Sequence, residues 1–328
     1  MKNTMKAAQI NRYGGGEVVE INENAPTPTV SQGHLLIEVH AAGVNPIDWK
    51  IREGYMQQMA PLQFPVTLGG DFSGIVMDVG DGVSGFTKGD EVYGQASVLG
   101  GGSGSFAEFL SANPTAVARK SKNVSHTEAA ALPLAGVSAL QALTEHIQLG
   151  KGPASATAST GKQTILIHGG AGGIGSFAIQ LAKHLGATVA ATASADDAQY
   201  VKDLGADQVI DYKTQKFEDL LHDYDAVFDT VGGETYARSF KVLRKGGVIV
   251  SMVEQPNAEL MQQYGVTAIS QFTQVTTERL SKLAELVEQG VIKVRLDKTF
   301  PLEQAGAALT YLQAGHPRGK VVVEIQKS

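Results

Sequence analysis

The sequence predicts an α/β protein in which a doubly wound parallel sheet of six strands is joined to an antiparallel β-barrel domain. After residue 164, β-branched runs alternate with helical patterns, as in a parallel sheet that helices cover on both faces. Before residue 124, short β runs are separated by Gly, Pro and Asp turns, as in an antiparallel barrel. A chain of 328 residues is long enough for two such domains, each of roughly 100 to 200 residues.

The first domain is predicted from short β runs with turn residues at both ends. Strands are expected at residues 35–41, 74–79, 90–93 and 106–110. Ser125 and Glu128 have the spacing of a capping box that starts an Ala-rich helix, and Pro133 should break that helix. We therefore expect the first domain to span residues 1–126.

The second domain is predicted over residues 127–272. Its first strand ends at Ile167, and the helix that follows carries apolar residues at helical spacing. Further strands are expected at 188–192, 208–211, 226–229, 248–251 and 267–272, with helices at 196–204 and 235–243. A further helix is expected beyond the last strand, at 278–289. The stretch from Lys151 to Gly161, rich in Ala, Ser and Thr, is expected to be an exposed loop. Residues 273–328 form a C-terminal segment whose β-like run at 320–325 should rejoin the first domain.

Composition excludes several classes of function. The 27 basic and 33 acidic residues give a net charge of −6, with no long run of one sign, so nucleic acid and membrane surfaces are not expected partners. The absence of cysteine excludes disulfides, thiolate catalysis and metal sites with sulfur ligands. No signal peptide precedes residue 10, and the apolar region 129–143 is too short and interrupted to span a membrane. We expect a soluble, cytoplasmic protein that acts on a small molecule.

Five glycines gather between the first strand of the second domain and its helix. Gly170-x-Gly172-x-x-Gly175 has the spacing in which one glycine makes the turn, one admits a pyrophosphate, and one lets helix and strand pack closely. The helix N-terminus then offers free N–H groups to the anion. This segment predicts dinucleotide binding; a glycine loop without a ligand is the alternative. The candidate binding residues are Gly169, Gly170, Gly172, Gly173, Ile174 and Gly175.

Several strings resemble the medium-chain dehydrogenase/reductase superfamily, and the resemblance covers essentially the whole chain. They are residues 42–50, 69–74, 129–133 with 139–143, and the glycine turn. The chain resembles in particular the zinc-lacking quinone oxidoreductases of the zeta-crystallin type and the alkenal/one oxidoreductases. This resemblance implies a GroES-like catalytic domain, a Rossmann cofactor domain and a homodimer.

In the zinc-dependent branch of that superfamily, a cysteine ligand stands where this chain has Asn45, and a Gly-His-Glu motif stands where it has Gly69-Gly70-Asp71. Because zinc sites use Cys, His and carboxylates, Asn and Gly cannot replace the missing thiolate and imidazole. We therefore expect no catalytic zinc.

Reduction of an isolated ketone builds a localised alkoxide that zinc would hold, whereas an enolate or quinol spreads the charge. Hydrogen-bond donors, each worth on the order of 3 kcal/mol, can then suffice.

These features predict an NADPH-dependent oxidoreductase that transfers a hydride to a quinone or to the C=C bond of an α,β-unsaturated carbonyl compound, without zinc. One alternative is a cofactor-binding structural or regulatory protein of the zeta-crystallin type with little turnover. Another is a zinc-containing alcohol dehydrogenase, which metal analysis would identify. Fold alone does not separate the three.

The candidate catalytic residues are Asn45 and Tyr55. The resemblance places an Asn near the nicotinamide and substrate; the alternative is a loop Asn that bonds its own backbone before Pro46. Tyr55 is a candidate to donate a proton or stack on a flat acceptor, although Met56 occupies the aligned position of the related tyrosine. Asp48 and Lys50 are expected to be solvated surface charges, with a local charge network between them as the alternative. We expect His168 to support the site and not to act as a general base.

Three further residues are candidates for cofactor binding. Ser138 matches a Ser/Thr position that touches the cofactor in the family, with an ordinary helix serine as the alternative. NAD enzymes place Asp or Glu about 20 residues after the glycines, but the second strand here runs into Ser194 without an acid. This leaves room for the 2′-phosphate of NADPH, which Ser194 is placed to bond. The resemblance adds Tyr212, which matches a family tyrosine near that phosphate. Asp197, where the family often has lysine, would repel that phosphate and keeps NADH possible.

Overall fold

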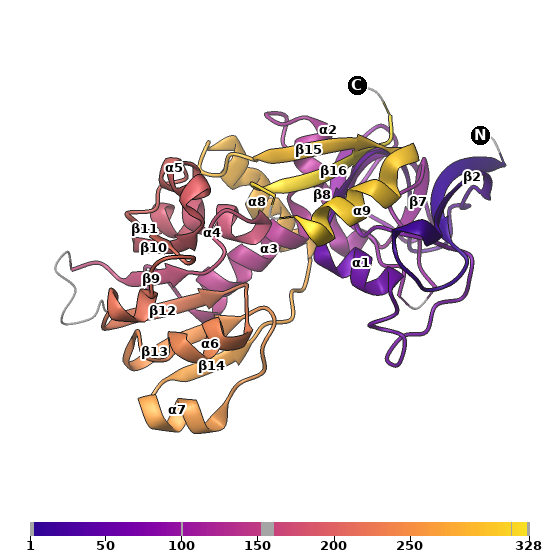
Figure 1. The fold of residues 1–328 in the computed structure, drawn as a ribbon. Helices are drawn as coiled ribbons and strands as arrows, with labels where there is room; N and C mark the ends of the chain where they lie inside the picture. Colours follow the sequence, from indigo (N-terminus) through magenta and orange to yellow (C-terminus); the bar gives the residue numbers. More distant parts are fainter. Residues whose placement is uncertain (1–2, 100, 152–160, 316, 327–328) are drawn as a thin grey trace. The chain divides into compact units, whose positions relative to one another are not determined.

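The computed structural model describes residues 3–326 except 100, 152–160 and 316. The chain forms two compact units (Figure 1). The first unit comprises Met1–Val137, Val275–Gly290 and Val294–Ser328, and the second comprises Ser138–Gln274 and Val291–Lys293. The loop expected over residues 151–161 lies almost wholly outside the described residues.

The second unit holds a parallel sheet of six strands in the part of the chain that is described, in the order β11-β10-β9-β12-β13-β14. This order confirms the predicted doubly wound sheet. The strand order reverses beside β9, so the loop after β9 lies where such sheets bind ligands. The strands are β9 (Thr164–Ile167), β10 (Thr188–Ala193), β11 (Gln208–Asp211), β12 (Tyr224–Asp229), β13 (Leu243–Ser251) and β14 (Thr267–Ser270).

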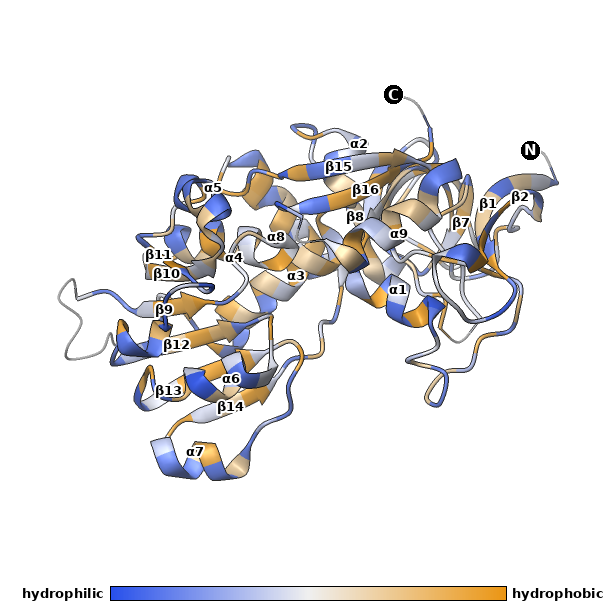
Figure 2. Ribbon diagram, in the orientation of Figure 1, coloured by the Kyte–Doolittle hydropathy of each residue, from blue (hydrophilic) through white to orange (hydrophobic). Residues whose placement is uncertain are grey.

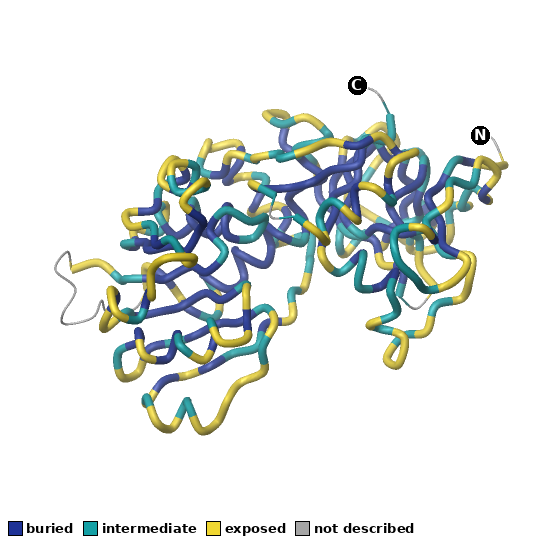
Figure 3. Tube along the Cα trace, in the orientation of Figure 1, coloured by how far each residue is buried: buried dark blue, intermediate teal, exposed yellow. Residues whose placement is uncertain are grey.

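Helices connect these strands, and their bounds correct two expectations. The helices are α4 (Gly173–His184), α5 (Ala198–Asp203), α6 (Gly233–Ser239) and α7 (Ala258–Tyr264). The helix expected over 235–243 ends at Ser239, because Leu243 already pairs with β12 as the start of β13. Helix α7 was not predicted from the sequence. It is only seven residues long and has no fully buried residue, and Leu260, Met261 and Tyr264 pack against the core while partly exposed, so its apolar pattern is short (Figure 3).

Apolar side chains hold α6 against one face of the six-stranded sheet. Leu166, Val227 and Ile249 come from three neighbouring strands and belong to one cluster with Tyr236 and Phe240 of α6. Figure 2 shows that hydrophobic residues predominate along β9 and β12. Tyr236 and Phe240 meet edge to face, with ring centroids 5.2 Å apart. This packing gives the carboxyl ends of β9 and β12 a rigid support.

The first unit contains, among its described residues, a sheet of three strands and a sheet of seven. The order is β2-β1-β4 in one and β15-β16-β3-β5-β6-β8 in the other, with β7 also paired to β3. Neighbours are antiparallel, as predicted, except that β15 and β16 are parallel. The strands are β1 (Thr4–Ile10), β2 (Val19–Pro26), β3 (Leu35–Val44), β4 (Val66–Thr67), β5 (Asp71–Val79), β6 (Glu91–Gln95), β7 (Phe109–Ala112), β8 (Val117–Arg119), β15 (Leu296–Pro301) and β16 (Lys320–Glu324).

Some of the remaining helices follow from local signals in the sequence. The remaining helices are α1 (Pro46–Arg52), α2 (His126–Ala130), α3 (Pro133–Gln141), α8 (Thr277–Glu288) and α9 (Ala305–Ala314). The predicted capping box is confirmed, since Glu128 Oε2 accepts from the Ser125 N–H at 2.8 Å and Ser125 Oγ accepts from the Glu128 N–H at 3.3 Å. The predicted break at Pro133 separates α2 from α3. Helix α9 makes the crossover that parallel β15 and β16 require.

Strand β16 brings the C-terminal region to the middle of the larger sheet. Val321 to Glu324 pair antiparallel with the residues from Val44 back to Ala41 in β3. Lys320, at the start of β16, therefore lies beside the end of β3 and the beginning of α1.

The strand expected at 106–110 begins later, at Phe109. Among the described helices, none is long and apolar enough to cross a bilayer.

Candidate functional site

The glycine turn of the second unit is held by backbone contacts that leave no room for side chains. The Gly170 N–H donates to Thr192 O at 2.9 Å, and the Gly172 N–H donates to Gly169 O at 3.0 Å. Gly169 has φ +71°, which favours glycine. A Cβ on Gly175 would lie 2.1 Å from Gly169 O, so only glycine lets α4 approach the turn.

The beginning of α4 fits the diphosphate of a dinucleotide. The first N–H groups of a helix lack intrahelical partners, and here they belong to Gly173, Ile174 and Gly175. The N-cap, Gly172, supplies no side chain to bond them. An anion at this end would receive several N–H donors and the positive end of the helix dipole. The predicted residues of the turn are thus brought together in an arrangement suited to a pyrophosphate.

His168 supports the turn through a chain of hydrogen bonds. Ser239 Oγ donates to Thr235 O at 2.6 Å, so its oxygen is left to accept from His168 Nε2 at 2.9 Å. We therefore assign the proton to Nε2, which makes Nδ1 the acceptor for Thr192 Oγ1 at 3.1 Å. Thr192 Oγ1 in turn accepts the Gly169 N–H at 3.2 Å.

The state of His168 agrees with this supporting role. The side chain is fully buried, and burial lowers the pKa of His168 to about 3, with Arg238 as a smaller cause. The ring is therefore neutral at physiological pH. The prediction that His168 supports the site is consistent with this geometry.

Ser194 and Tyr212 come from neighbouring strand ends. The Tyr212 N–H donates to Ala193 O at 3.2 Å, which places Tyr212 beside the end of β10. Tyr212 is half exposed, whereas Ser194 is nearly buried. The Ser194 hydroxyl donates to Asp197 Oδ2 at 2.6 Å. Two predicted cofactor residues thus lie together, and the carboxylate that would oppose a phosphate is bonded to one of them.

Ser138 lies apart from the turn along the chain and is fully buried. Its Oγ is 2.7 Å from Thr273 Oγ1, and its carbonyl oxygen accepts from Gln271 Nε2 at 3.0 Å. Ser138 therefore ties α3 to the segment after β14. A role in cofactor binding stays a prediction.

In the first unit, Asn45 is the centre of a buried polar cluster. The residue is 3% exposed and is the N-cap of α1. Its side-chain Nδ2 donates to Asp71 Oδ2 at 2.9 Å, and its Oδ1 accepts from Lys320 Nζ. Its backbone N–H donates to Asp48 Oδ2 at 2.7 Å. Asn45 and Asp48 also form a capping box at the start of α1, which is the local backbone role given above as the alternative for an Asn before Pro46. The contacts with Asp71 and Lys320 are additional to that role.

We call Asn45, Asp48, Asp71 and Lys320 the polar cluster. Asp71 is fixed from its far side, because Oδ2 also accepts from the Leu134 N–H at 2.9 Å and Oδ1 accepts from Gln95 Nε2 at 3.2 Å. Lys320 Nζ additionally donates to Val44 O at 3.2 Å. Every member is bonded to another member, as buried polar groups require.

The expectation that Asp48 is a solvated surface charge is wrong. Asp48 is 3% exposed, because it turns back to bond the N-terminus of α1. Burial raises the pKa of Asp48 to about 7, with the charge of Asp71 adding to the rise and Lys320 opposing it. Burial also raises the pKa of Asp71 and lowers that of Lys320. One ammonium thus faces two carboxyl groups, and Asp48 holds a proton below about pH 7.

The polar cluster does not fit a catalytic zinc ion. Asn45 stands at the position of the cysteine ligand, and its oxygen is occupied by the ammonium of Lys320, whose charge would repel a metal cation. Gly70 stands at the position of the histidine ligand and borders the cluster, since a Cβ there would lie 4.0 Å from Asp48 Oδ1. Among the described residues, no three His, Asp or Glu side chains are arranged to hold a metal.

Tyr55 lies in the turn after α1, away from the polar cluster's hydrogen bonds. It is 67% exposed, and its ring meets that of Trp49 edge to face at 5.8 Å between centroids. Met56, the neighbouring residue, packs against the apolar core instead. Catalysis by Tyr55 stays a prediction.

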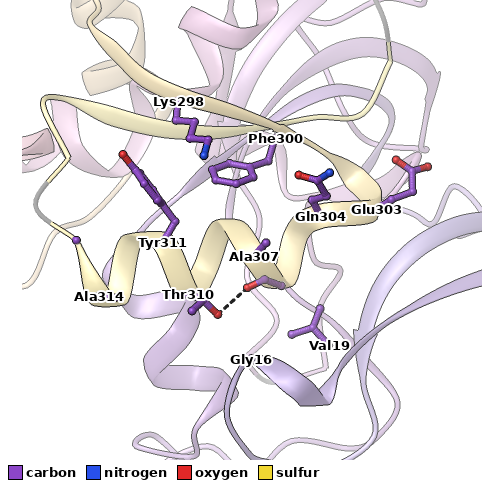
Figure 4. A pocket seen from close by; sticks show the side chains of 12 residues that line it. Gly16, Val19, Lys298, Phe300, Glu303, Gln304, Ala307, Thr310, Tyr311 and Ala314 are labelled. Carbon is purple, nitrogen blue, oxygen red and sulfur yellow. Dashed lines mark hydrogen bonds between the residues drawn. The ribbon is translucent and has the colours of Figure 1, made fainter.

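An open groove of about 780 Å³ lies along α9 in the first unit (Figure 4). Lys298 Nζ lies over the rings of Phe300 and Tyr311, at 4.7 and 4.9 Å from their centroids. No predicted site residue lines this groove. It is therefore separate from the polar cluster.

Lys320 is the member of the polar cluster that the sequence did not indicate. It precedes a run of three valines, and a lysine at a strand end is ordinarily exposed. The only signal that could have found it is the pairing of β16 with β3, which no local pattern specifies.

The fold and the glycine turn together define a class: a two-domain oxidoreductase that uses a nicotinamide dinucleotide. Comparisons with known proteins agree. Residues 31–122 match the alcohol dehydrogenase GroES-like domain, and residues 204–323 match the family described as zinc-binding dehydrogenase.

Relatives extend over nearly the whole chain. The chain is 36% identical to a chloroplast envelope quinone oxidoreductase homolog from Arabidopsis thaliana, with 98% of each chain covered. It is 37% identical to an NADPH-dependent alkenal/one oxidoreductase, chloroplastic, from the same plant, covering 97% of this chain and 79% of that one. A quinone oxidoreductase structure from Coxiella burnetii superposes with a TM-score of 0.86 at 34% identity, covering 98% and 99% of the two chains. The protein belongs to the quinone oxidoreductase and alkenal/one oxidoreductase branch of the medium-chain dehydrogenases/reductases.

Proposed function

We propose that this protein transfers a hydride from NADPH to a quinone or to the C=C bond of an α,β-unsaturated carbonyl compound, without zinc. The observation that carries this proposal is the Asn45 amide, which is held between Asp71 and Lys320 where a metal ligand would stand. An amide offers N–H donors and no Lewis acid. Such a site suits acceptors whose negative charge spreads over an enolate or a quinol.

Each part of the site has a separate task. NADPH, when bound, supplies the hydride. The N–H groups of Gly173, Ile174 and Gly175 bind its diphosphate. An amide nitrogen carries two N–H bonds, and Asp71 uses one of those on Asn45. The second N–H binds the carbonyl oxygen of the acceptor and stabilises the charge that develops there. The related proteins named above support this choice of acceptor.

NADPH is proposed over NADH for two reasons. No acidic residue follows β10 directly, so Ser194 and the neighbouring Tyr212 leave space for a 2′-phosphate. One relative is described as NADPH-dependent. Asp197 opposes this preference, because its carboxylate lies 2.6 Å from Ser194 Oγ. We therefore propose a preference for NADPH with measurable use of NADH.

The test is NADPH oxidation, followed by the loss of the near-ultraviolet absorbance of the reduced nicotinamide, against a panel of quinones, enones and simple ketones. We expect turnover with quinones or enones and none with simple ketones. Metal analysis of the active protein should show zinc far below one ion per chain. NADPH binding without oxidation of any acceptor would instead establish the structural or regulatory alternative. Stoichiometric zinc with alcohol oxidation would establish an alcohol dehydrogenase.

We also propose that the protein is a cytoplasmic homodimer with domain boundaries near residues 126 and 272. Light scattering of the purified protein tests the dimer, and cell fractionation tests the compartment. Limited proteolysis tests the boundaries, since exposed connections between domains are cut first.

A further inference from the structure

The function proposed above gives no task to a lysine buried in the first unit. Lys320 is 4% exposed and lies at the start of β16. Burial of an ammonium group is unfavourable unless hydrogen bonds and opposite charges in the protein offset the loss of hydration. Lys320 donates to Asn45 Oδ1 and to Val44 O, and it faces Asp71 and Asp48 electrostatically. The Lys320 ammonium is therefore bonded to Asn45, the residue that we propose binds the acceptor oxygen.

We propose that Lys320 is the positioning residue that makes Asn45 a directed hydrogen-bond donor to the oxygen of a quinone or conjugated carbonyl. This inference rests on the proposed function and adds the residue that sets the geometry of that site. Lys320 acts through Asn45 and does not itself touch the acceptor.

The first argument is geometric. Asn45 presents its oxygen to the Lys320 ammonium and its nitrogen to the Asp71 carboxylate. If the amide were turned over, its NH2 group would face the ammonium and its oxygen would face the carboxylate, so both contacts would become repulsive. Asp71 is itself fixed by the Leu134 N–H and by Gln95. The amide is thus held at both ends in one orientation, and the second N–H has a fixed direction.

The second argument is electronic. A cation bonded to an amide oxygen draws electron density from the nitrogen, so the remaining N–H becomes a stronger donor. This effect is large only where water is excluded, and Asn45 and Lys320 are both nearly buried. A fixed positive charge behind the amide also favours negative charge on an oxygen in front of it. Lys320 thereby supplies, through Asn45, part of the stabilisation that a metal ion would give directly.

The test is a double-mutant cycle between Lys320→Met and Asn45→Ala. In the wild-type background, we expect Lys320→Met to lower kcat for quinones or enones about 30-fold while the Kd for NADPH changes less than about twofold. In the Asn45→Ala background, Lys320→Met should cost no further activity, because the group through which it acts is gone. Equal losses in both backgrounds would overturn the proposal and leave Lys320 a structural residue. Lys298→Met, at the exposed lysine beside α9, is the matched control and should keep wild-type kcat.

Loss of Lys320 alone leaves two buried carboxyl groups without a cation and can unfold the protein. The variant Lys320→Gln with Asp71→Asn replaces the ion pair by two amides of similar size and leaves the net charge of the cluster unchanged. We expect it to fold, to bind NADPH, and to remain about tenfold or more slower than wild type. Wild-type kcat in this folded variant would contradict the inference. The outcome is separable from failure of the proposed function, in which the wild-type protein itself oxidises no NADPH with any acceptor.

Discussion

The glycine turn of the second unit and the polar cluster of the first unit are built in opposite ways. The turn uses backbone N–H groups within one stretch of seven residues, Gly169 to Gly175, and works because side chains are absent. The cluster uses four side chains that are spread over the sequence between positions 45 and 320. It depends on the hydrogen bonds that join Asp48, Asp71 and Lys320 to Asn45. The difference teaches that the backbone site depends on the glycines whose Cβ would clash, whereas the side-chain site depends on each bonded partner.

The largest expected effect is at the turn. In Gly175→Ala, the new Cβ would meet Gly169 O at 2.1 Å, so α4 must move away from β9. We expect the free energy of unfolding to fall by about 3 kcal/mol or more, and NADPH binding to be lost. Thermal melting and fluorescence titration with NADPH measure the two effects. Gly172→Ala is the matched control, because its Cβ has only an ordinary contact, at 3.4 Å from Gly169 O, and φ is −75°. Equal melting temperatures for the two variants would contradict the steric argument.

The next effect is at the polar cluster. Asn45→Ala removes the proposed donor to the acceptor oxygen and should lower kcat about 100-fold, the cost of losing one preorganised donor. NADPH affinity should change little, since the diphosphate is held by the turn. Steady-state rates and an NADPH titration separate these outcomes. Asn11→Ala removes an exposed amide of the same kind, bonded to Glu20, and should leave kcat within about twofold. An Asn45→Ala enzyme of normal kcat would exclude Asn45 from catalysis.

The two regions also differ in how far the sequence predicts them. The six strands of the parallel sheet, the turn and its helix follow from local spacing, because apolar periodicity and glycine steric limits act within a few residues. The polar cluster does not follow from local spacing. The residues around Asp48 in the sequence are typical of an exposed charge, and only the pairing of β16 with β3 brings Lys320 next to Asn45. Asn45 itself was predicted from family resemblance, but its partners were not. Helices α1, α7 and α9 were missed, because α1 and α7 are only seven residues long and the many small residues of α9 give little contrast between its faces.

A smaller effect concerns pH and comes from Asp48. Its pKa in the folded protein is about 7, above the value of about 3.9 expected for an unfolded chain. Between these values the folded protein holds a proton that the unfolded chain has released, so stability falls as pH rises from about 4 to 7 and is flat above. Asp48→Asn removes this titration while keeping an acceptor for the Asn45 N–H.

We expect denaturant titrations to show that Asp48→Asn makes the decline between about pH 4 and 7 shallower by on the order of 2 kcal/mol. Asp78→Asn is the control, because Lys88 lowers the pKa of Asp78 and leaves it ionised in both states over most of this range. A wild-type slope in Asp48→Asn would show that Asp48 is ionised in the folded protein.

The smallest expected effect is in the second unit and concerns Asp197, whose side chain lies beside the proposed position of the 2′-phosphate. The Asp197 carboxylate accepts the Ser194 hydroxyl proton at 2.6 Å and opposes a 2′-phosphate beside it. Asp197→Ala removes the repulsion and frees Ser194 to donate to the phosphate. We expect NADPH affinity to rise about threefold with NADH affinity unchanged, since charges near the surface contribute roughly 0.2–1 kcal/mol. Asp203→Ala, where the carboxylate accepts from Gln199, is the control. Equal gains for both cofactors would mean that Asp197 acts on the fold of the loop and not on the phosphate.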